Sequence, residues 1–258
     1  MHYSISGKGK AIVLIHGFIE EGYMWAALAK KLAASYKVLV PDLPGFGNSP
    51  LTTGKVSMPY FAEAIYKMLH KEGIKDCVML GHSMGGYVSL EFARKHSDML
   101  SGFGLVNSHC FADTEEKKNN RVKGNDFIKR HGSGPFVREL YPALFHEKFQ
   151  KKAANKKLIQ TLTEKAALYA PEALIAANTA MKDRRDNAAV LRESKVPVLL
   201  ISGRQDESVP LAHSLKQALL ANNTDFVLFD NCKHMAVFEY EHETYRAIKR
   251  FADSCYGR

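Results

Sequence analysis

Short apolar runs recur along the chain and predict strands that are buried on both faces of a sheet. Residues 11–15 form a continuous aliphatic run, and residues 37–40 and 196–203 have the same character. Segments whose apolar residues recur at helical spacing separate these runs. This alternation predicts a mostly parallel sheet with helices on both faces. The expected strands are 2–6, 11–15, 37–40, 77–80, 102–107, 196–203 and 226–229, and the expected helices between them are 24–35, 60–72, 87–95, 211–221 and 241–254.

The alternation stops between residues 111 and 194, where no strand-like run occurs. A long strandless block between two strand signals favours a helical insertion that caps the carboxyl edge of the sheet. A set of ordinary surface helices is the alternative. We therefore predict an α/β core at 1–110 and 195–258, with a helical cap at 111–194. Helical periodicity is found at 125–130, 136–144, 152–169 and 172–181, and the charged run 115–118 is interpreted as the solvated start of a helix.

The stretch Gly81-His82-Ser83-Met84-Gly85-Gly86 lies between an expected strand and an expected helix. Strand, G-x-S-x-G and helix together are the context of a nucleophile elbow. Gly81 and Gly85 flank Ser83 because side chains there would collide where strand and helix approach closely. The N–H of Met84 would lie at a helix N-terminus, where it can stabilise an oxyanion. Because the pentapeptide arises by chance in roughly one chain in ten of this length, a glycine-rich turn is the alternative.

Two later loops supply residues that could activate this serine. A serine hydroxyl is a weak nucleophile until a base removes its proton, and the base needs a carboxylate to hold its tautomer. In a parallel α/β sheet, such groups gather in loops at the carboxyl ends of the strands. Ser83, Asp206 and His234 occur in such loops in the order serine, acid, histidine. Glu207 and Asp230 are the other candidates for the acid.

Four other histidines compete with His234 for the role of base. His82 is next to the serine but shares its strained turn, so we do not expect it to face the hydroxyl. His16 precedes the serine in the chain, and His213 opens a helix. His109 follows the strand after the elbow helix and is the strongest rival.

The loop after strand 11–15 is His16-Gly17-Phe18. Gly17 permits a close backbone approach, and the N–H of Phe18 would then point toward the serine hydroxyl as a second oxyanion donor. A routine turn at the end of a strand is the alternative. The presence of the elbow favours the functional interpretation.

Together, these motifs resemble the α/β-hydrolase fold superfamily, and within it the capped serine esterase and meta-cleavage-product hydrolase group. The resemblance implies that Asp206 is the acid, that Phe18 supplies the second oxyanion N–H, and that a helical cap lies between the strands near 105 and 199. Members often begin with one more antiparallel strand, so the sheet edge is where this chain departs from the pattern. The motifs that carry the resemblance are His16-Gly17-Phe18, 42–49, 81–86, 203–210 and His234.

The chemistry expected is hydrolysis of a small carboxylic ester or related acyl compound through an acyl-enzyme, with no metal or organic cofactor. Hydrolysis of a C–C bond and acyl transfer are compatible with the same triad. A ligand receptor built on the hydrolase fold is an alternative from a different class. Phe145, Leu174 and Met181 are the cap residues that we expect in the pocket lining.

Composition excludes few functions. The net charge is +9, from 36 Lys and Arg against 27 Asp and Glu, but the lysines are scattered, which favours a solvated basic surface over a nucleic-acid site. Gly7-x-Gly9 and Gly45-x-Gly47 are interpreted as turns, because neither has the spacing of a dinucleotide-binding motif. We expect a small-molecule acyl substrate, with no nucleic-acid and no membrane partner. The oligomeric state is left open.

The cysteines and the short apolar runs predict the compartment. None of the four cysteines forms a C-x-x-C pair, so a zinc or redox motif is not expected. Cys77 lies in a buried strand pattern, which suits a reducing compartment. No signal peptide pattern opens the chain, and the apolar runs are too short to span a bilayer. We therefore expect a cytoplasmic protein.

Overall fold

A seven-stranded sheet lies at the centre of the structure, a computed structural model that describes residues 1–52 and 54–257. The strand order is β1-β3-β2-β4-β5-β6-β7, and every neighbouring pair is parallel except β1 with β3. The predicted mostly parallel sheet is therefore confirmed. The strands are β1 (Tyr3–Ser6), β2 (Ala11–Ile15), β3 (Lys37–Pro41), β4 (Cys77–His82), β5 (Leu100–Val106), β6 (Val198–Gly203) and β7 (Thr224–Phe229).

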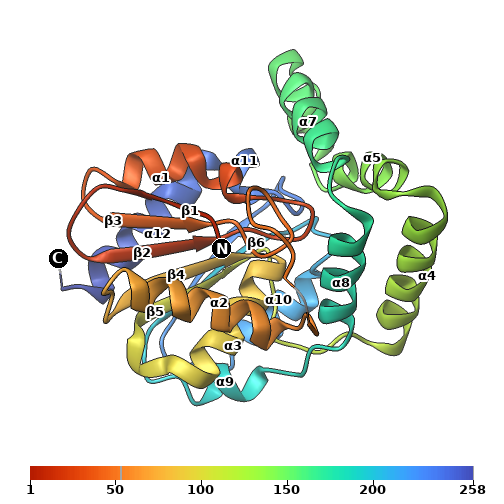
Figure 1. Ribbon diagram of the computed structural model, residues 1–258. Helices are drawn as coiled ribbons and strands as arrows, with labels where there is room; N and C mark the ends of the chain where they lie inside the picture. Colours follow the sequence, from red (N-terminus) through yellow and green to blue (C-terminus); the bar gives the residue numbers. More distant parts are fainter. Residues whose placement is uncertain (53, 258) are drawn as a thin grey trace.

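Helices cover both faces of the sheet and divide the core into two apolar layers (Figure 1). One layer lies under α1 and α12, whose apolar residues recur every three or four positions, as in Ile248, Phe251 and Ala252. The other layer lies under α2 and α3. The helices outside the insertion are η1 (Gly22–Trp25), α1 (Ala26–Leu32), α2 (Met58–Lys71), α3 (Met84–His96), η2 (Ser97–Met99), α10 (Leu211–Ala218), α11 (Ala236–Glu239) and α12 (Glu241–Cys255).

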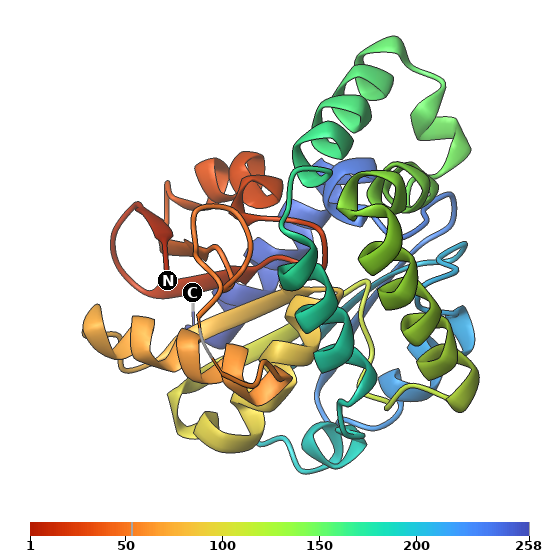
Figure 2. The ribbon, with the colours of Figure 1, turned by 45° about the vertical axis from the view of Figure 1, so that its right-hand side comes forward.

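The segment between β5 and β6 is helical, and residues 107–197, which are all described, contain no strand. Figures 1 and 2 show α4, α5, α7 and α8 gathered to one side of the molecule, with α7 extending farthest from the sheet, whereas the short helix α9 lies beside α3. Helix α4 packs against α8, and α5 packs against α7. The existence of a separate cap unit with boundaries at 111 and 194 stays a prediction. The helices are α4 (Glu115–His131), α5 (Ser133–Ala143), α6 (Glu147–Gln150), α7 (Ala153–Ala166), α8 (Pro171–Lys182) and α9 (Ala188–Arg192).

The helices of this segment agree in part with those expected. Helix α4 begins at Glu115, where the charged run 115–118 indicated a helix start, and Thr114 caps it by accepting a hydrogen bond from the N–H of Lys117. Only Asn125 and Ile128 are buried on this helix, so its first turns show no apolar periodicity. The short helices α6, α9 and α11 were not predicted, because one turn is too short to display a period.

The first strand occupies the sheet edge that the sequence left uncertain. β1 pairs antiparallel with β3, with Tyr3 opposite Pro41 and Ser6 opposite Val38. The glycine pairs at 7 and 9 and at 45 and 47 lie in turns or bends and have positive φ, which confirms their interpretation as turns.

In 1–52 and 54–257, no helix combines the length and the apolar character that crossing a bilayer requires.

β2, β4 and α3 meet at a close backbone approach. A Cβ atom at Gly81 would lie 2.1 Å from the carbonyl oxygen of Gly85. A Cβ atom at Gly85 would lie 2.5 Å from the carbonyl oxygen of Ile15 and 2.6 Å from that of His16. The neighbours in both cases are backbone atoms, so the space cannot be opened by a rotamer change. The turn that carries Ser83 therefore requires glycine on both sides.

We expect Gly85→Ala to destabilise the protein by about 1–3 kcal/mol or more, because α3 must move away from β2 to admit the methyl group. Urea unfolding followed by circular dichroism measures the change. The matched control is Gly134→Ala in α5, where only the mobile end of Arg138 lies within 3 Å of the new Cβ. The control should be neutral or slightly stabilising, since alanine is the better helix former. Equal stabilities for the two variants would contradict this account.

Candidate active site

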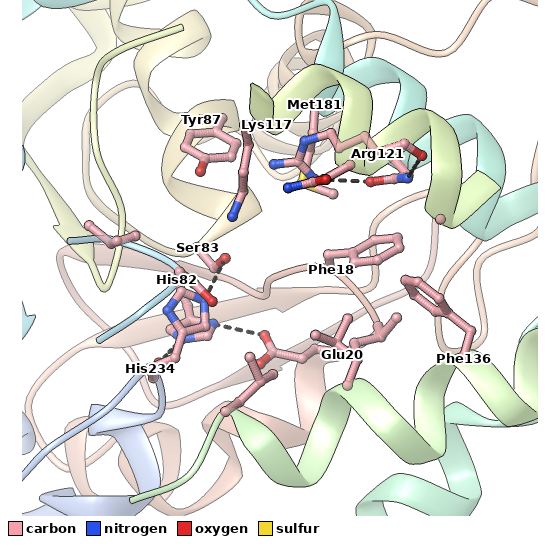
Figure 3. A pocket seen from close by; sticks show the side chains of 18 residues that line it. Phe18, Glu20, His82, Ser83, Tyr87, Lys117, Arg121, Phe136, Met181 and His234 are labelled. Atoms are coloured by element: carbon pink, nitrogen blue, oxygen red, sulfur yellow. Dashed lines mark hydrogen bonds and ion pairs between the residues drawn. The ribbon is translucent and has the colours of Figure 1, made fainter. Parts of the chain in front are cut away.

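Ser83 follows β4 in a strained conformation and begins a chain of three side chains. Its φ is 49° and its ψ is −114°, which is costly for a residue other than glycine, by about 1–3 kcal/mol. Its Oγ lies 2.9 Å from Nε2 of His234, and Nδ1 of His234 lies 2.8 Å from Oδ2 of Asp206. The three residues come from the loops after β4, β6 and β7, and Figure 3 shows Ser83 and His234 next to each other. The structure therefore brings together the serine, acid and histidine expected from the sequence.

The strained turn is held by backbone hydrogen bonds. The N–H of Ser83 donates to the carbonyl of Val106 at 2.9 Å, and the N–H of Gly86 donates to the carbonyl of Ser83 at 2.9 Å. The Ser108 hydroxyl donates to that same carbonyl at 2.7 Å. These contacts leave the Ser83 side chain with His234 as its partner.

Asp206 is placed to fix the protonation of His234. Its Oδ1 accepts hydrogen bonds from the backbone N–H groups of Ser208 and Val209, and its Oδ2 accepts from Asn107. Burial alone would raise the pKa of this carboxyl, but His234 and the three donors hold the pKa below its ordinary value. An ionised Asp206 accepts a hydrogen bond from the Nδ1–H of His234 and so keeps the proton on Nδ1, which leaves Nε2 free to accept the proton of the Ser83 hydroxyl.

The rival acids point away from this chain. The Glu207 side chain is 83% exposed and pairs with Lys233 at 3.1 Å. The Asp230 side chain is 72% exposed and pairs with Arg204 at 2.6 Å. Of the three acids considered from the sequence, Asp206 alone contacts the histidine among the described residues.

The rival histidine is also directed elsewhere. Nδ1 of His109 accepts the N–H of Phe111 at 3.2 Å, and its Nε2 lies 3.5 Å from the guanidinium of Arg184. Burial, followed by the charge of Arg184, lowers the pKa of His109 well below its ordinary range. His109 is therefore a neutral, buried residue beside the pocket and has no hydrogen bond to Ser83 among the described residues.

Asn107 is a site residue that sequence reasoning missed. Its Nδ2 donates to Asp206 and to the carbonyl of Lys233, both at 3.0 Å, and its Oδ1 accepts from the N–H of Ala236 at 3.3 Å. It adopts a left-handed φ of 46°, which asparagine tolerates better than most residues. The sequence did offer one signal for this role, because Asn107 comes directly after the strand that follows the elbow helix, at the edge of the sheet where site residues gather.

The loop with the second expected oxyanion donor is fixed by His16. Nε2 of this ring accepts the N–H of Leu43 at 2.8 Å, so its Nδ1 carries the proton and donates to the carbonyl of Gly17 at 2.8 Å. Burial lowers the pKa of His16, which agrees with a neutral ring. The N–H groups of Phe18 and Met84 donate to no acceptor within the described part of the chain. Both are therefore available to a ligand.

His82 forms a buried ion pair with Glu20. Its Nδ1 lies 2.9 Å from Oε2 of Glu20, and its Nε2 lies 2.8 Å from the carbonyl oxygen of His234. Both partners are acceptors, so both ring nitrogens carry protons. Burial alone would lower the pKa of His82, but Glu20 raises it above its ordinary value. Burial likewise opposes ionisation of Glu20, whereas His82 and the N–H of Gly17 hold the pKa of this carboxyl low.

This ion pair joins three loops of the site. Glu20 accepts from Gly17 in the loop of Phe18, His82 is next to Ser83, and His82 donates to the backbone of His234. The expectation that His82 does not face the serine hydroxyl is confirmed. The pair could not be inferred from the sequence, because nothing in the pattern joins positions 20 and 82.

A cavity of about 240 Å³ opens at Ser83 (Figure 3). Of the three cap residues expected in its lining, Met181 is there, whereas Phe145 and Leu174 are fully buried in the core. The expectation was wrong for Phe145 and Leu174, because helical periodicity shows which face of a helix is buried but not what that face packs against. The residues that line the cavity include Phe18, Glu20, Tyr87, Lys117, Arg121, Phe136, Leu140, Leu144, Met181 and Val209.

Comparison with known proteins agrees with this architecture. The family model described as alpha/beta hydrolase fold matches residues 10–130. A pimeloyl-[acyl-carrier protein] methyl ester esterase of Aeromonas salmonicida is 31% identical over 209 residues, which cover 80% of this chain and 81% of the relative. The chain belongs to the α/β-hydrolase fold family. The fold class and the family predicted from the sequence are thereby confirmed.

Other relatives of this α/β hydrolase differ in reaction. A 2-hydroxy-6-oxo-6-phenylhexa-2,4-dienoate hydrolase of Burkholderia cepacia is 26% identical over 259 residues, covering 93% of this chain and 86% of the relative. A thermophilic esterase from Thermogutta terrifontis, solved with malate bound, superposes with a TM-score of 0.93. It is 28% identical, and the match covers 98% of this chain and 93% of that one. The relatives are thus esterases and C–C bond hydrolases.

The ion pair predicts a pH-dependent loss of stability in Glu20→Gln. Because the pKa of His82 is raised in the folded protein, His82 stabilises the wild type. This stabilisation is complete below pH 6.5, the ordinary pKa of histidine, and is lost as the pH rises through the pKa of the folded state. The lowered pKa of Glu20 stabilises the wild type above the ordinary value of 4.5. Without the carboxylate, burial lowers the pKa of His82, so the variant gains stability as pH rises. We expect a deficit of about 3–5 kcal/mol near pH 5.5 that narrows by about pH 8.5.

Urea unfolding at the two pH values measures this deficit. The control is Glu164→Gln, which removes the same charge from a pair whose two side chains, Arg138 and Glu164, are both half exposed. This control should cost less than about 1 kcal/mol at either pH. A deficit for Glu20→Gln that does not change with pH would show that His82 is not charged in the folded protein.

Proposed function

We propose that this α/β hydrolase is a serine esterase that cleaves a small carboxylic ester or related acyl compound through an acyl-enzyme. The observation that carries the proposal is the hydrogen-bonded chain Ser83–His234–Asp206 at the wall of the cavity. A base positioned by an ionised carboxylate activates a serine hydroxyl. The esterase relatives from Aeromonas salmonicida and Thermogutta terrifontis support the same reaction class.

In the proposed cycle, Ser83 Oγ attacks the ester carbonyl while Nε2 of His234 takes the hydroxyl proton. The carbonyl oxygen becomes an oxyanion and accepts hydrogen bonds from the N–H groups of Phe18 and Met84. The tetrahedral intermediate collapses, the ester C–O bond breaks, and His234 gives the proton to the departing alcohol. The acyl group is then bonded to Ser83 Oγ.

Water completes the cycle. His234 removes a proton from a water molecule, which attacks the acyl carbonyl, and the second intermediate returns Ser83 and releases the acid. Asp206 stabilises the imidazolium at each step without taking its proton. The proposed cycle needs no metal or organic cofactor. We propose a small-molecule substrate in the cytoplasm, with neither nucleic acid nor membrane as partner.

Hydrolysis of a C–C bond is the second candidate. The Burkholderia cepacia relative, a 2-hydroxy-6-oxo-6-phenylhexa-2,4-dienoate hydrolase, supports it, because the match covers 86% of that protein. The two reactions are separated by offering one preparation both 2-hydroxy-6-oxo-6-phenylhexa-2,4-dienoate and chromogenic esters of increasing acyl length. A larger kcat/KM for the dienoate than for every ester would favour the C–C hydrolase.

We expect Ser83→Ala to reduce ester turnover on the order of 10⁴- to 10⁶-fold, because the nucleophile is removed. Initial rates with a chromogenic acetate or butanoate ester measure the loss. The matched control is Ser133→Ala, which removes a buried hydroxyl at the start of α5 that does not line the cavity. The control should retain wild-type rates. Retention of a tenth of the activity by Ser83→Ala would exclude Ser83 as the nucleophile.

A fluorophosphonate probe tests whether the serine is activated. We expect a single adduct on the wild type by intact mass, located at Ser83 by peptide mapping and absent from Ser83→Ala. The result follows because only a serine with a positioned base reacts readily with such probes. A wild type without adduct would favour the ligand receptor over the enzyme.

A further inference from the structure

Lys117 is a cation in the catalytic cavity without a partner of its own. It stands in the first turn of α4, is half-buried, and lines the same cavity as Ser83. Figure 3 shows its side chain directed into the cavity toward Ser83. Within the described ranges, its Nζ has no hydrogen bond or ion pair; the N–H of this residue is used for the helix cap. A buried or half-buried ammonium is costly unless something compensates its charge.

The carboxylates nearest to Lys117 are already occupied. Oδ2 of Asp113 lies 2.5 Å from Nε of Arg121, and its Oδ1 lies 2.6 Å from Nη1 of Arg184. Asp206 uses both oxygens within the site, on His234 and the loop after β6. None of these oxygens is left for Lys117.

The local charge is therefore unbalanced. One carboxylate, that of Asp113, faces the guanidinium groups of Arg121 and Arg184, and Lys117 adds a third positive charge. Burial, followed by the charge of Arg121, lowers the pKa of Lys117, and together with Arg184 these effects outweigh the opposing charges of Asp113 and Asp206. An anion bound to Lys117 would balance the excess positive charge and would favour the charged form of the ammonium.

The rest of the cavity has a different character. Phe18 and Phe136 form an aromatic contact at 6.4 Å between ring centroids and lie on the far side of the cavity from Tyr87 in Figure 3. Lys117 and Tyr87 lie together on the opposite side of the cavity from the two phenylalanines, close to Ser83. The guanidinium of Arg184 lies over the Tyr87 ring. A ligand whose reacting carbonyl is at Ser83 thus has an apolar wall on one side and a cationic group on the other.

We propose that Lys117 forms an anion subsite and that the preferred substrate is a small ester that carries a carboxylate a few bonds from its reacting carbonyl. This inference rests on the proposed esterase function and specifies its substrate class. The carboxylate binds the Nζ of Lys117, and the aliphatic part of the substrate lies against the apolar wall. Lys117 is thus a specificity-determining residue that takes no part in the proton transfers.

The test compares two esters that differ only in this charge. Methyl hydrogen adipate and methyl hexanoate share the reacting group and chain, and acid release is followed with a pH indicator. We expect the wild type to favour the charged ester. Lys117→Gln should lower kcat/KM for methyl hydrogen adipate about tenfold to a hundredfold, the effect of one charge-assisted hydrogen bond, and leave methyl hexanoate unchanged. Lys117→Arg should keep part of the preference.

The matched control is Lys118→Gln, which removes the same charge at the next position. Lys118 pairs with Glu115 at 2.7 Å and does not line the cavity, so this variant should retain the wild-type preference. Thermal unfolding of each variant checks that α4 is intact. A wild type that favours methyl hexanoate, or an equal loss on both esters in Lys117→Gln, would overturn the proposal.

A binding measurement separates this inference from the esterase proposal. Calorimetry with Ser83→Ala, which needs no turnover, compares adipate with hexanoate as ligands. We expect adipate to bind more tightly, and the difference to vanish in Ser83→Ala/Lys117→Gln. If neither ester is hydrolysed but this difference is found, the esterase proposal fails and the anion subsite stands. If esters are hydrolysed and the difference is absent, the anion subsite fails alone.

Discussion

The contact between the start of α3 and the end of β2 is the constraint on which the site depends. Backbone atoms of Gly85 and Ile15 approach so closely that a single methyl group does not fit between them. This approach forces Ser83 into its left-handed conformation and points its hydroxyl away from the sheet. It also brings the loop of Phe18, which continues β2, beside the serine. One packing contact thus sets the position of the proposed nucleophile and of both proposed oxyanion donors.

Charge matching holds the surrounding loops in place. His82 and Glu20 connect the loops after β2, β4 and β7, and Asp206 connects those after β6 and β7 through His234, with help from Asn107. Each of these side chains is buried and hydrogen-bonded to a partner of the site, as a low-dielectric interior demands. Against this background, the unpaired ammonium of Lys117 is the exception, and exceptions to polar pairing concentrate where a ligand binds.

Much of the fold could be predicted, because strands buried on both faces must be continuously apolar and the helices between them show a period. The order Ser83, Asp206, His234 was readable because strand ends carry the site in a parallel sheet. The roles of Glu20 and Lys117 could not be predicted. Glu20 acts through His82, which is distant in the chain, and Lys117 stands out because the structure gives it no ion-pair partner among the described residues. The start of α4 was indicated only by its charged run, because solvent surrounds its first turns and they show no apolar period. Phe145 was misplaced because a period shows that a helix face is buried but not which residues cover it.

The proposed nucleophile and its activating base lie far apart in the order of synthesis. Ser83 follows β4, a strand inside the sheet, whereas His234 follows β7, which is one of the two edge strands and the last strand in the chain. Domains are made from the N-terminus, so a nascent chain can carry the elbow serine before its histidine exists. Such a chain holds an unactivated hydroxyl that is inert toward acyl compounds in the cell. In the proposed mechanism, the serine therefore becomes reactive only after the loop that follows β7 has been made and has reached the site.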